Sequence, residues 1–125
     1  MKFREPKDSE NLVWTEHVKE KMRFYYLSET KLKNILRNPE REEKGIATHT
    51  VAVMQSVKSK RQNREIWLMY RTIKFKTPLP GSKSGKLKEK RQKIIIISAW
   101  RYPGTSPIGE PPIPQDVIEY LKTYE

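Results

Sequence analysis

Three segments of this chain alternate in side-chain character with a period of two, and two of them are apolar on both faces. They cover residues 48–57, 65–76 and 93–102 and are rich in β-branched and aromatic residues, with four consecutive isoleucines at 94–97. This pattern is typical of β-strands. Because a strand with two apolar faces must be covered on both sides, the chain needs a layer above and a layer below its sheet. The short connection between the first two segments predicts an antiparallel meander.

Two short amphipathic helices are predicted before the strands. The first follows Thr15 and the second follows Ser28, and both residues are suited to cap a helix N-terminus. The first helix places Val18 and Met22 on one face. The second ends at Asn38-Pro39, since the residue before a proline disfavours helix. These helices are expected to cover one face of the sheet.

A proline-rich tail follows the third strand. Five prolines force an extended backbone there, namely Pro103, Pro107, Pro111, Pro112 and Pro114. A short helix is predicted from about Gln115, with apolar residues at helical spacing at Val117, Ile118, Leu121 and Tyr124. We expect the tail to cover part of the second face of the sheet. A peptide ligand for a proline-recognition domain is the alternative.

Length and composition favour one soluble domain over residues 1–125, with its core in residues 14–102. A chain of 125 residues is long enough to bury a sizeable core. The absence of cysteine excludes disulfides, thiolate catalysis and the usual structural zinc sites, and it fits a reducing compartment. The first ten residues lack the apolar stretch of a secretory signal, and the longest aliphatic run is too short to span a bilayer. A cytoplasmic protein without a membrane partner is expected.

The whole net charge of +11 lies in residues 58–93, where 13 bases face two acids. A cationic segment of this size attracts a polyanion, because each neutralised phosphate releases counterions. The alternative is a solvated loop that only keeps the protein soluble. RNA is favoured over duplex DNA, since no predicted helix is basic enough to read a major groove. The candidate nucleic-acid-binding residues are Lys58, Lys60, Arg61, Arg64, Lys74, Lys76, Lys86, Lys88, Lys90 and Arg91.

Metal-independent RNA cleavage needs a base, cations around the phosphate and an acid. The candidates are His17, Arg71, Arg101 and Tyr102. For His17 the alternative is a partly buried, hydrogen-bonded structural role. Arg71 and Arg101 would share one patch if the second and third strands paired in a suitable register, and catalysis requires that convergence. No convincing metal site and no cofactor site stand out.

Three short motifs resemble the RelE/ParE-type toxin superfamily, and within it the BrnT-type toxins. They are the His-to-Met pattern of residues 14–22, the segment 28–39 that ends in Asn-Pro, and the aliphatic, Ser-Ala, Trp-Arg sequence of residues 96–101. The resemblance covers about residues 14–102. It implies an α+β fold in which two N-terminal helices pack on a curved antiparallel sheet of three, or possibly four, strands. It also implies RNA as ligand and endonucleolytic cleavage without a metal as an activity of the family.

Three hypotheses of function follow. The first is an RNA- or ribosome-binding protein in which catalysis is left open. The second is a metal-independent toxin endoribonuclease. The third is a protein-interaction subunit whose basic surface is neutralised by an acidic, antitoxin-like partner. The concentrated charge favours binding as the common element of the first two.

Overall fold

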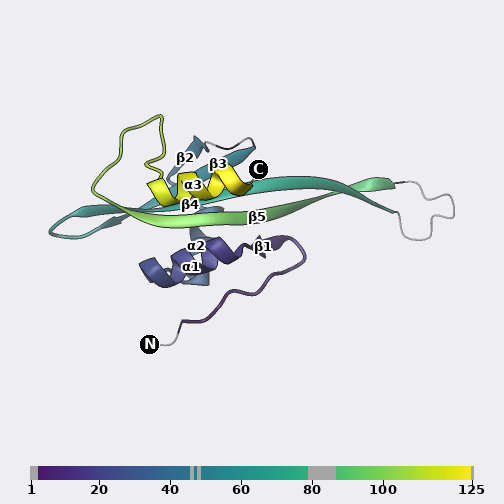
Figure 1. The fold of residues 1–125 in the computed structure, drawn as a ribbon, viewed down its shortest axis with the longest axis horizontal. Helices are drawn as coiled ribbons and strands as arrows, with labels where there is room; N and C mark the ends of the chain where they lie inside the picture. Colours follow the sequence, from purple (N-terminus) through teal and green to yellow (C-terminus); the bar gives the residue numbers. More distant parts are fainter. Residues whose placement is uncertain (1–2, 46, 48, 79–86, 125) are drawn as a thin grey trace.

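The computed structural model describes residues 3–45, 47, 49–78 and 87–124. These residues form a five-stranded sheet with helices on both faces (Figure 1). In chain order the elements are β1 (Leu12–Trp14), α1 (Glu16–Tyr25), α2 (Glu29–Arg37), β2 (Arg41–Lys44), β3 (Thr50–Lys58), β4 (Asn63–Pro78), β5 (Leu87–Pro103) and α3 (Gln115–Tyr124). Within the described residues, no helix has the length and apolarity needed to cross a membrane.

The α+β class is confirmed, but the expected sheet of three or four antiparallel strands is wrong in strand count and direction. The strand order is β1-β5-β4-β3-β2, with β1 parallel to β5 and every other pair antiparallel. β1 and β2 were not predicted, because one is only three residues long and the other has the polar sequence Arg-Glu-Glu-Lys. Backbone pairing with a longer neighbour is what makes such segments strands.

β4 and β5 form the long hairpin at the centre of the fold, and β5 begins at Leu87 instead of the expected Lys93. Their ladder is regular except for a β-bulge and an irregularity near its far end. At the bulge, Met69 pairs with Ser98 and Tyr70 with Ile96, so Ile97 is an extra residue in β5. A bulge of this kind shifts the alternation of side chains between the two faces of the strand.

Both N-terminal helices begin at the predicted caps. The Val18 amide donates to Oγ1 of Thr15 at 3.1 Å, and the Lys31 amide donates to Oγ of Ser28 at 3.1 Å. The C-cap of α1 is Tyr26, which has a left-handed backbone with φ of 56°. The first amides of a helix have no carbonyl partner within the helix, and the two capping side chains supply an acceptor instead. These caps fix where each helix starts.

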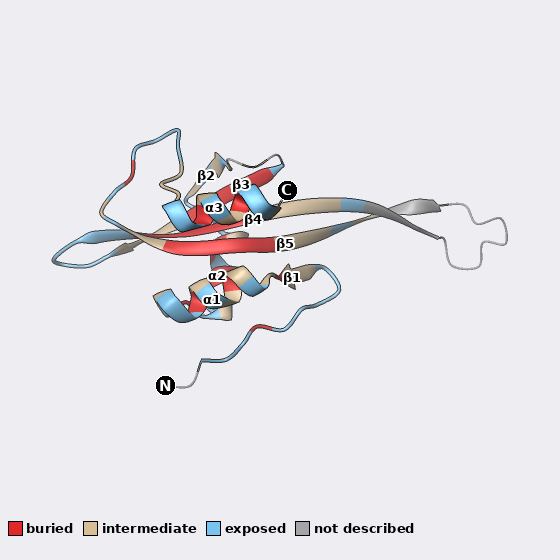
Figure 2. Cartoon of the chain, viewed as in Figure 1, coloured by how far each residue is buried: buried red, intermediate tan, exposed pale blue. Residues whose placement is uncertain are grey.

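The expectation that both faces of the sheet are covered is confirmed (Figure 2). One core lies between the sheet and α1 with α2, and it contains Val18, Met22 and Ile96. The other lies between the sheet and α3, and it contains Ile97 and the helix residues Val117 and Leu121. The isoleucine run therefore supplies both cores. The side chain of Tyr124 lies outside the described residues.

Trp67 and Trp100 form the centre of the core under α3. They are paired across β4 and β5, fully buried, and stacked with ring centroids 6.2 Å apart and planes inclined by 7°. Large aromatic pairs of this kind contribute more to core stability than smaller side chains.

A buried polar network fastens the proline-rich segment to the sheet. Glu65 is buried, and its carboxylate accepts from Ser106 Oγ at 2.6 Å, the Ser106 amide at 3.2 Å and Trp67 Nε1 at 2.9 Å. Nη1 of Arg41 lies 3.6 Å from Glu65 and donates to the Ser106 hydroxyl at 2.9 Å. Arg41 also pairs with Glu43, at 3.0 Å. Its charge and that of Glu65 therefore compensate each other within the fold.

Candidate nucleic-acid interface

The basic residues of 58–93 do not form one surface, and the first group lies at the turn between β3 and β4. This turn cluster consists of Lys58, Lys60, Arg61 and Arg64, and all four are exposed. The turn is stabilised by Ser59, whose hydroxyl donates to the Gln62 carbonyl at 2.7 Å and accepts from the Gln62 amide at 3.2 Å. No acidic residue interrupts residues 58–64.

The second group lies on the outer part of the β4–β5 hairpin, which we call the arm. β3 pairs with β4 only as far as Arg71, and β1 pairs with β5 only as far as Ile94. Beyond these points, six pairs from Ile73–Lys93 to Pro78–Leu87 continue as a two-stranded ribbon that projects from the body (Figure 1). The arm is residues 73–78 together with 87–93.

Six bases and one acid, Glu89, give the arm a net charge of +5. Lys74 is exposed, and Arg91 forms an ion pair with Glu10. Of Lys76, Lys88 and Lys90 the structure describes only the backbone, within β4 and β5, and Lys86 lies outside the described residues.

Most bases of residues 58–93 whose side chains the structure describes take part in no ion pair with another described residue. Eight ion pairs join described residues, and only one of them, Arg91–Glu10, uses a base from residues 58–93. The acids elsewhere pair mainly with bases elsewhere, as in Lys21–Asp116. The turn cluster and Lys74 at the base of the arm, all exposed, therefore remain available to a polyanion.

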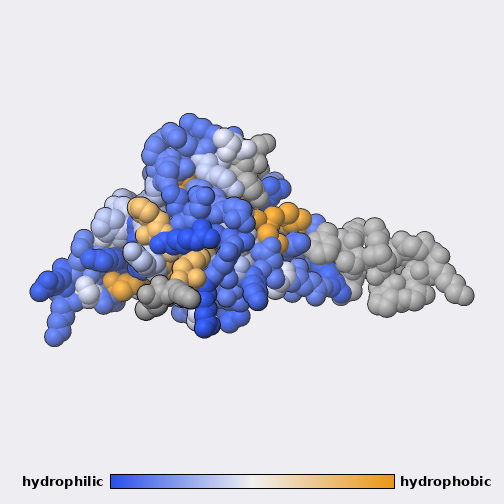
Figure 3. All heavy atoms as spheres, turned by 60° about the horizontal axis from the view of Figure 1, so that its bottom comes forward, coloured by the Kyte–Doolittle hydropathy of each residue, from blue (hydrophilic) through white to orange (hydrophobic). Residues whose placement is uncertain are grey.

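Two exposed aromatic side chains lie at the same end of the molecule as the turn cluster. Phe24 is 71% exposed and Tyr26 is 89% exposed, at the C-terminal end of α1. Figure 3 shows this helical side, where hydrophilic residues dominate and apolar ones form separate patches. Exposed rings beside cations are suited to stack nucleobases.

Arg101 connects that end of α1 to the sheet. Its Nε donates to the Tyr25 carbonyl at 2.7 Å and its Nη2 to the Tyr26 carbonyl at 3.2 Å. Burial lowers the pKa of Arg101 from its ordinary value, and the nearby charge of Arg64 adds to this. The guanidinium thus satisfies carbonyls that a helix end leaves without partners, which is a structural role.

The expected patch of Arg71 and Arg101 is not formed. β4 and β5 do pair as neighbours, but Arg71 lies opposite Ile95 and Arg101 lies opposite Ile66. Ile66 belongs to the core under α1 and α2, whereas Ile95 packs against the core under α3. Paired residues share a face, so the two arginines lie on opposite faces of the sheet. The hypothesis of a common phosphate-binding group is wrong for this pair.

The other two candidate catalytic residues are also used by the fold. Nε2 of His17 lies 3.0 Å from Oγ of Ser98, and the ring stacks on Tyr120 with centroids 4.0 Å apart. Tyr102 lies opposite Glu65 and packs against the core under α3. The four residues therefore do not converge on one concavity, which a cleavage site for RNA requires.

The shift in the titration of His17 predicts a pH-dependent stability. Burial, with a smaller effect of Lys21, lowers the pKa of His17 from 6.5 to about 4. Because the unfolded chain then takes up the proton first, the stabilisation is complete above pH 6.5 and is lost as the pH falls toward 4. We expect the free energy of unfolding to drop by about 1 kcal/mol between pH 7 and pH 5, a value reduced for the half-exposed ring.

Urea titrations at the two pH values measure this effect. His17→Phe should remove most of the difference, whereas His49→Asn, at the exposed second histidine with φ of 64°, should keep it. An unchanged difference in His17→Phe would assign the effect to other groups.

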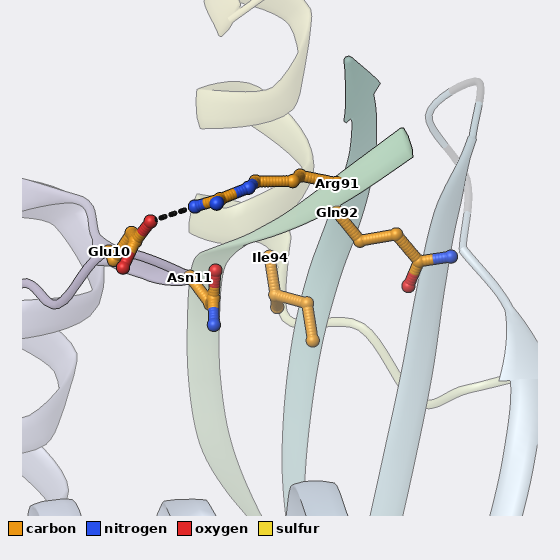
Figure 4. A pocket seen from close by; sticks show the side chains of 5 residues that line it. All are labelled: Glu10, Asn11, Arg91, Gln92 and Ile94. Atoms are coloured by element: carbon orange, nitrogen blue, oxygen red, sulfur yellow. Dashed lines mark hydrogen bonds and ion pairs between the residues drawn. The ribbon is translucent and has the colours of Figure 1, made fainter. Parts of the chain in front are cut away.

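A shallow hollow lies where β1 meets the base of the arm. It has a volume of about 460 Å³ and is lined by Glu10, Asn11, Arg91, Gln92 and Ile94 (Figure 4). Arg91 reaches across it to Glu10, while Gln92 points away from that pair (Figure 4). Its single cation is already paired with a carboxylate, so the hollow is not a strong anion site. In the part of the chain that the structure describes, no group of His, Asp and Glu residues could hold a metal ion.

Comparison of the chain with protein-family models, curated proteins and solved structures gives no match. The function is therefore inferred from the charge and geometry of the site itself.

Proposed function

We propose that this protein binds RNA, free or in a ribosome, through the turn cluster and the arm. The observation that carries the proposal is the unneutralised charge: the four bases of the turn cluster are exposed, and none takes part in an ion pair with a described residue. Such charge binds phosphate backbones by releasing counterions.

Exposed aromatics favour single-stranded RNA as the ligand. Tyr26 and Phe24 offer exposed rings at the C-terminal end of α1, where the Tyr26 carbonyl accepts from Arg101 and the charge of Arg64 acts on that guanidinium. Unpaired bases stack on such rings, whereas the bases of a duplex are already stacked on one another. The resemblance of residues 14–102 to BrnT-like toxins supports the same class of ligand.

Catalysis is not part of the proposal, since His17, Arg101 and Tyr102 are held in structural contacts. An acidic, antitoxin-like protein would compete for the same bases, because a row of carboxylates presents similar charge.

Fluorescence anisotropy with a labelled single-stranded RNA, without added metal, tests the proposal. If about five phosphates are contacted, raising the salt from 50 to 200 mM should weaken binding on the order of 100-fold. Replacing the turn cluster with glutamine (Lys58→Gln, Lys60→Gln, Arg61→Gln and Arg64→Gln) should reduce the slope of log K against log salt by about 2–3. The RNA should remain intact on a gel.

A matched variant controls for net charge alone. Lys7, Arg37, Lys44 and Lys122 are exposed bases outside residues 58–93, and their replacement by glutamine removes the same charge. This variant should bind like the original protein. Equal losses in both variants, or equal affinity for duplex DNA of the same sequence, would contradict the proposal, and discrete cleavage would favour the nuclease hypothesis.

A further inference from the structure

The two basic groups lie at opposite ends of the same strand. Arg64 of the turn cluster and Lys74 of the arm are ten residues apart in β4, a distance of about 33 Å at ~3.3 Å per residue. Figure 1 shows the turn between β3 and β4 at one end of the long axis and the arm at the other.

The body between the two groups has no net charge and carries helices on both faces of the sheet. Outside residues 58–93 the chain has equal numbers of bases and acids. α1 and α2 stand on one face of the sheet between the two ends, and α3 stands on the other (Figure 1). A straight nucleic-acid segment therefore cannot lie along β4 and contact both ends at the level of the sheet.

The two ends act as separate electrostatic sites. Their separation is several times the Debye length, about 8 Å at physiological ionic strength, so one end neither strengthens nor repels a polyanion at the other. Each carries a similar charge, with four bases in the turn cluster and a net +5 in the arm.

Resting on the proposed function, we infer that one copy of this protein binds two RNA segments, one at the turn cluster and one at the arm, and so bridges them. The protein is then a linker that raises the local concentration of one RNA near another. Its ligands are then two RNA phosphate backbones, one bound at each end of the molecule.

Energy transfer between two non-complementary RNAs, one with a donor and one with an acceptor dye, tests the bridge. Transfer should rise as protein is added to equal molarity and fall again in excess protein, when each RNA has its own copy. The turn-cluster variant above and an arm variant (Lys74→Gln, Lys76→Gln, Lys88→Gln and Lys90→Gln) each remove four bases. Each variant should still bind one RNA by anisotropy but lose at least five-fold in transfer.

The outcomes separate this inference from the proposed function. Binding without energy transfer in the original protein would overturn the bridge and leave RNA binding in place. Transfer retained by either single-end variant would also overturn it, because bridging would then come from self-association or from one end alone. No anisotropy change with either RNA would overturn both. Circular dichroism of the variants should match the original protein, as the substituted residues lie at the turn and on the projecting arm.

Discussion

Glu65→Ala should lower the free energy of unfolding by about 3–5 kcal/mol, because it removes one partner of a buried, hydrogen-bonded charge pair. The side chain is 3% exposed, and its loss leaves the Ser106 amide and Trp67 Nε1 without their acceptor. It also leaves Arg41 with Glu43 as its remaining described ion-pair partner. Urea denaturation measures the change. Hydrogen exchange should show faster exchange of the Ser106 amide.

Two other substitutions control this result. Glu65→Gln keeps the shape and an acceptor, and it should cost about 1–2 kcal/mol. Glu42→Ala removes an exposed carboxylate of β2 and should change stability by less than about 0.5 kcal/mol. If Glu65→Ala and Glu42→Ala had similar stabilities, the network would not fasten the proline-rich segment.

The second large effect is expected at the stacked tryptophans. Trp67→Ala and Trp100→Ala should each cost about 3–5 kcal/mol, the usual range for a buried tryptophan. Both side chains are 0% exposed and belong to the core under α3. Thermal and urea unfolding measure the loss.

Phenylalanine at the same positions separates packing from hydrogen bonding. Nε1 of Trp67 donates to Glu65 at 2.9 Å, whereas Nε1 of Trp100 is buried with no hydrogen-bond partner among the described residues. Trp67→Phe should therefore be less stable than Trp100→Phe by about 1.5–3 kcal/mol, the contribution of one hydrogen bond to a charged acceptor. Equal stabilities would show that the bond to Glu65 contributes nothing.

The helices and the central strands could be predicted because their signals are local. Thr15 and Ser28 are capping residues, and the strands carry β-branched and aromatic residues at a period of two. β2 and the outer part of β5 could not be predicted in this way. Their residues are mostly polar, and they are strands because a longer neighbour satisfies their backbone groups.

The candidate site was predictable in its residues but not in its arrangement. The bases are consecutive in sequence, yet β4 passes through the core between Arg64 and Lys74 and separates them into two groups. Whether Arg71 and Arg101 share a face depends on the register of β4 against β5, and the sequence pattern does not fix that register to within one residue. Glu65 gave no signal, since its partners Arg41 and Ser106 are distant in the sequence.

Because Ile97 is an extra residue, the side chains of β5 alternate between the two faces of the sheet in one phase before it and in the opposite phase after it. On either side of it, odd and even positions exchange the core that they face, so Ile94 and Ile96 share a core with Ala99, whereas Ile97 shares one with Trp100. Deleting Ile97 would restore uniform alternation and leave the later side chains of β5 facing their present cores, whereas deleting a residue after this junction would turn the side chains beyond it to the opposite face. The length of β5 can therefore change by one residue at the bulge without reversing the faces of its later side chains, but it cannot do so farther along the strand.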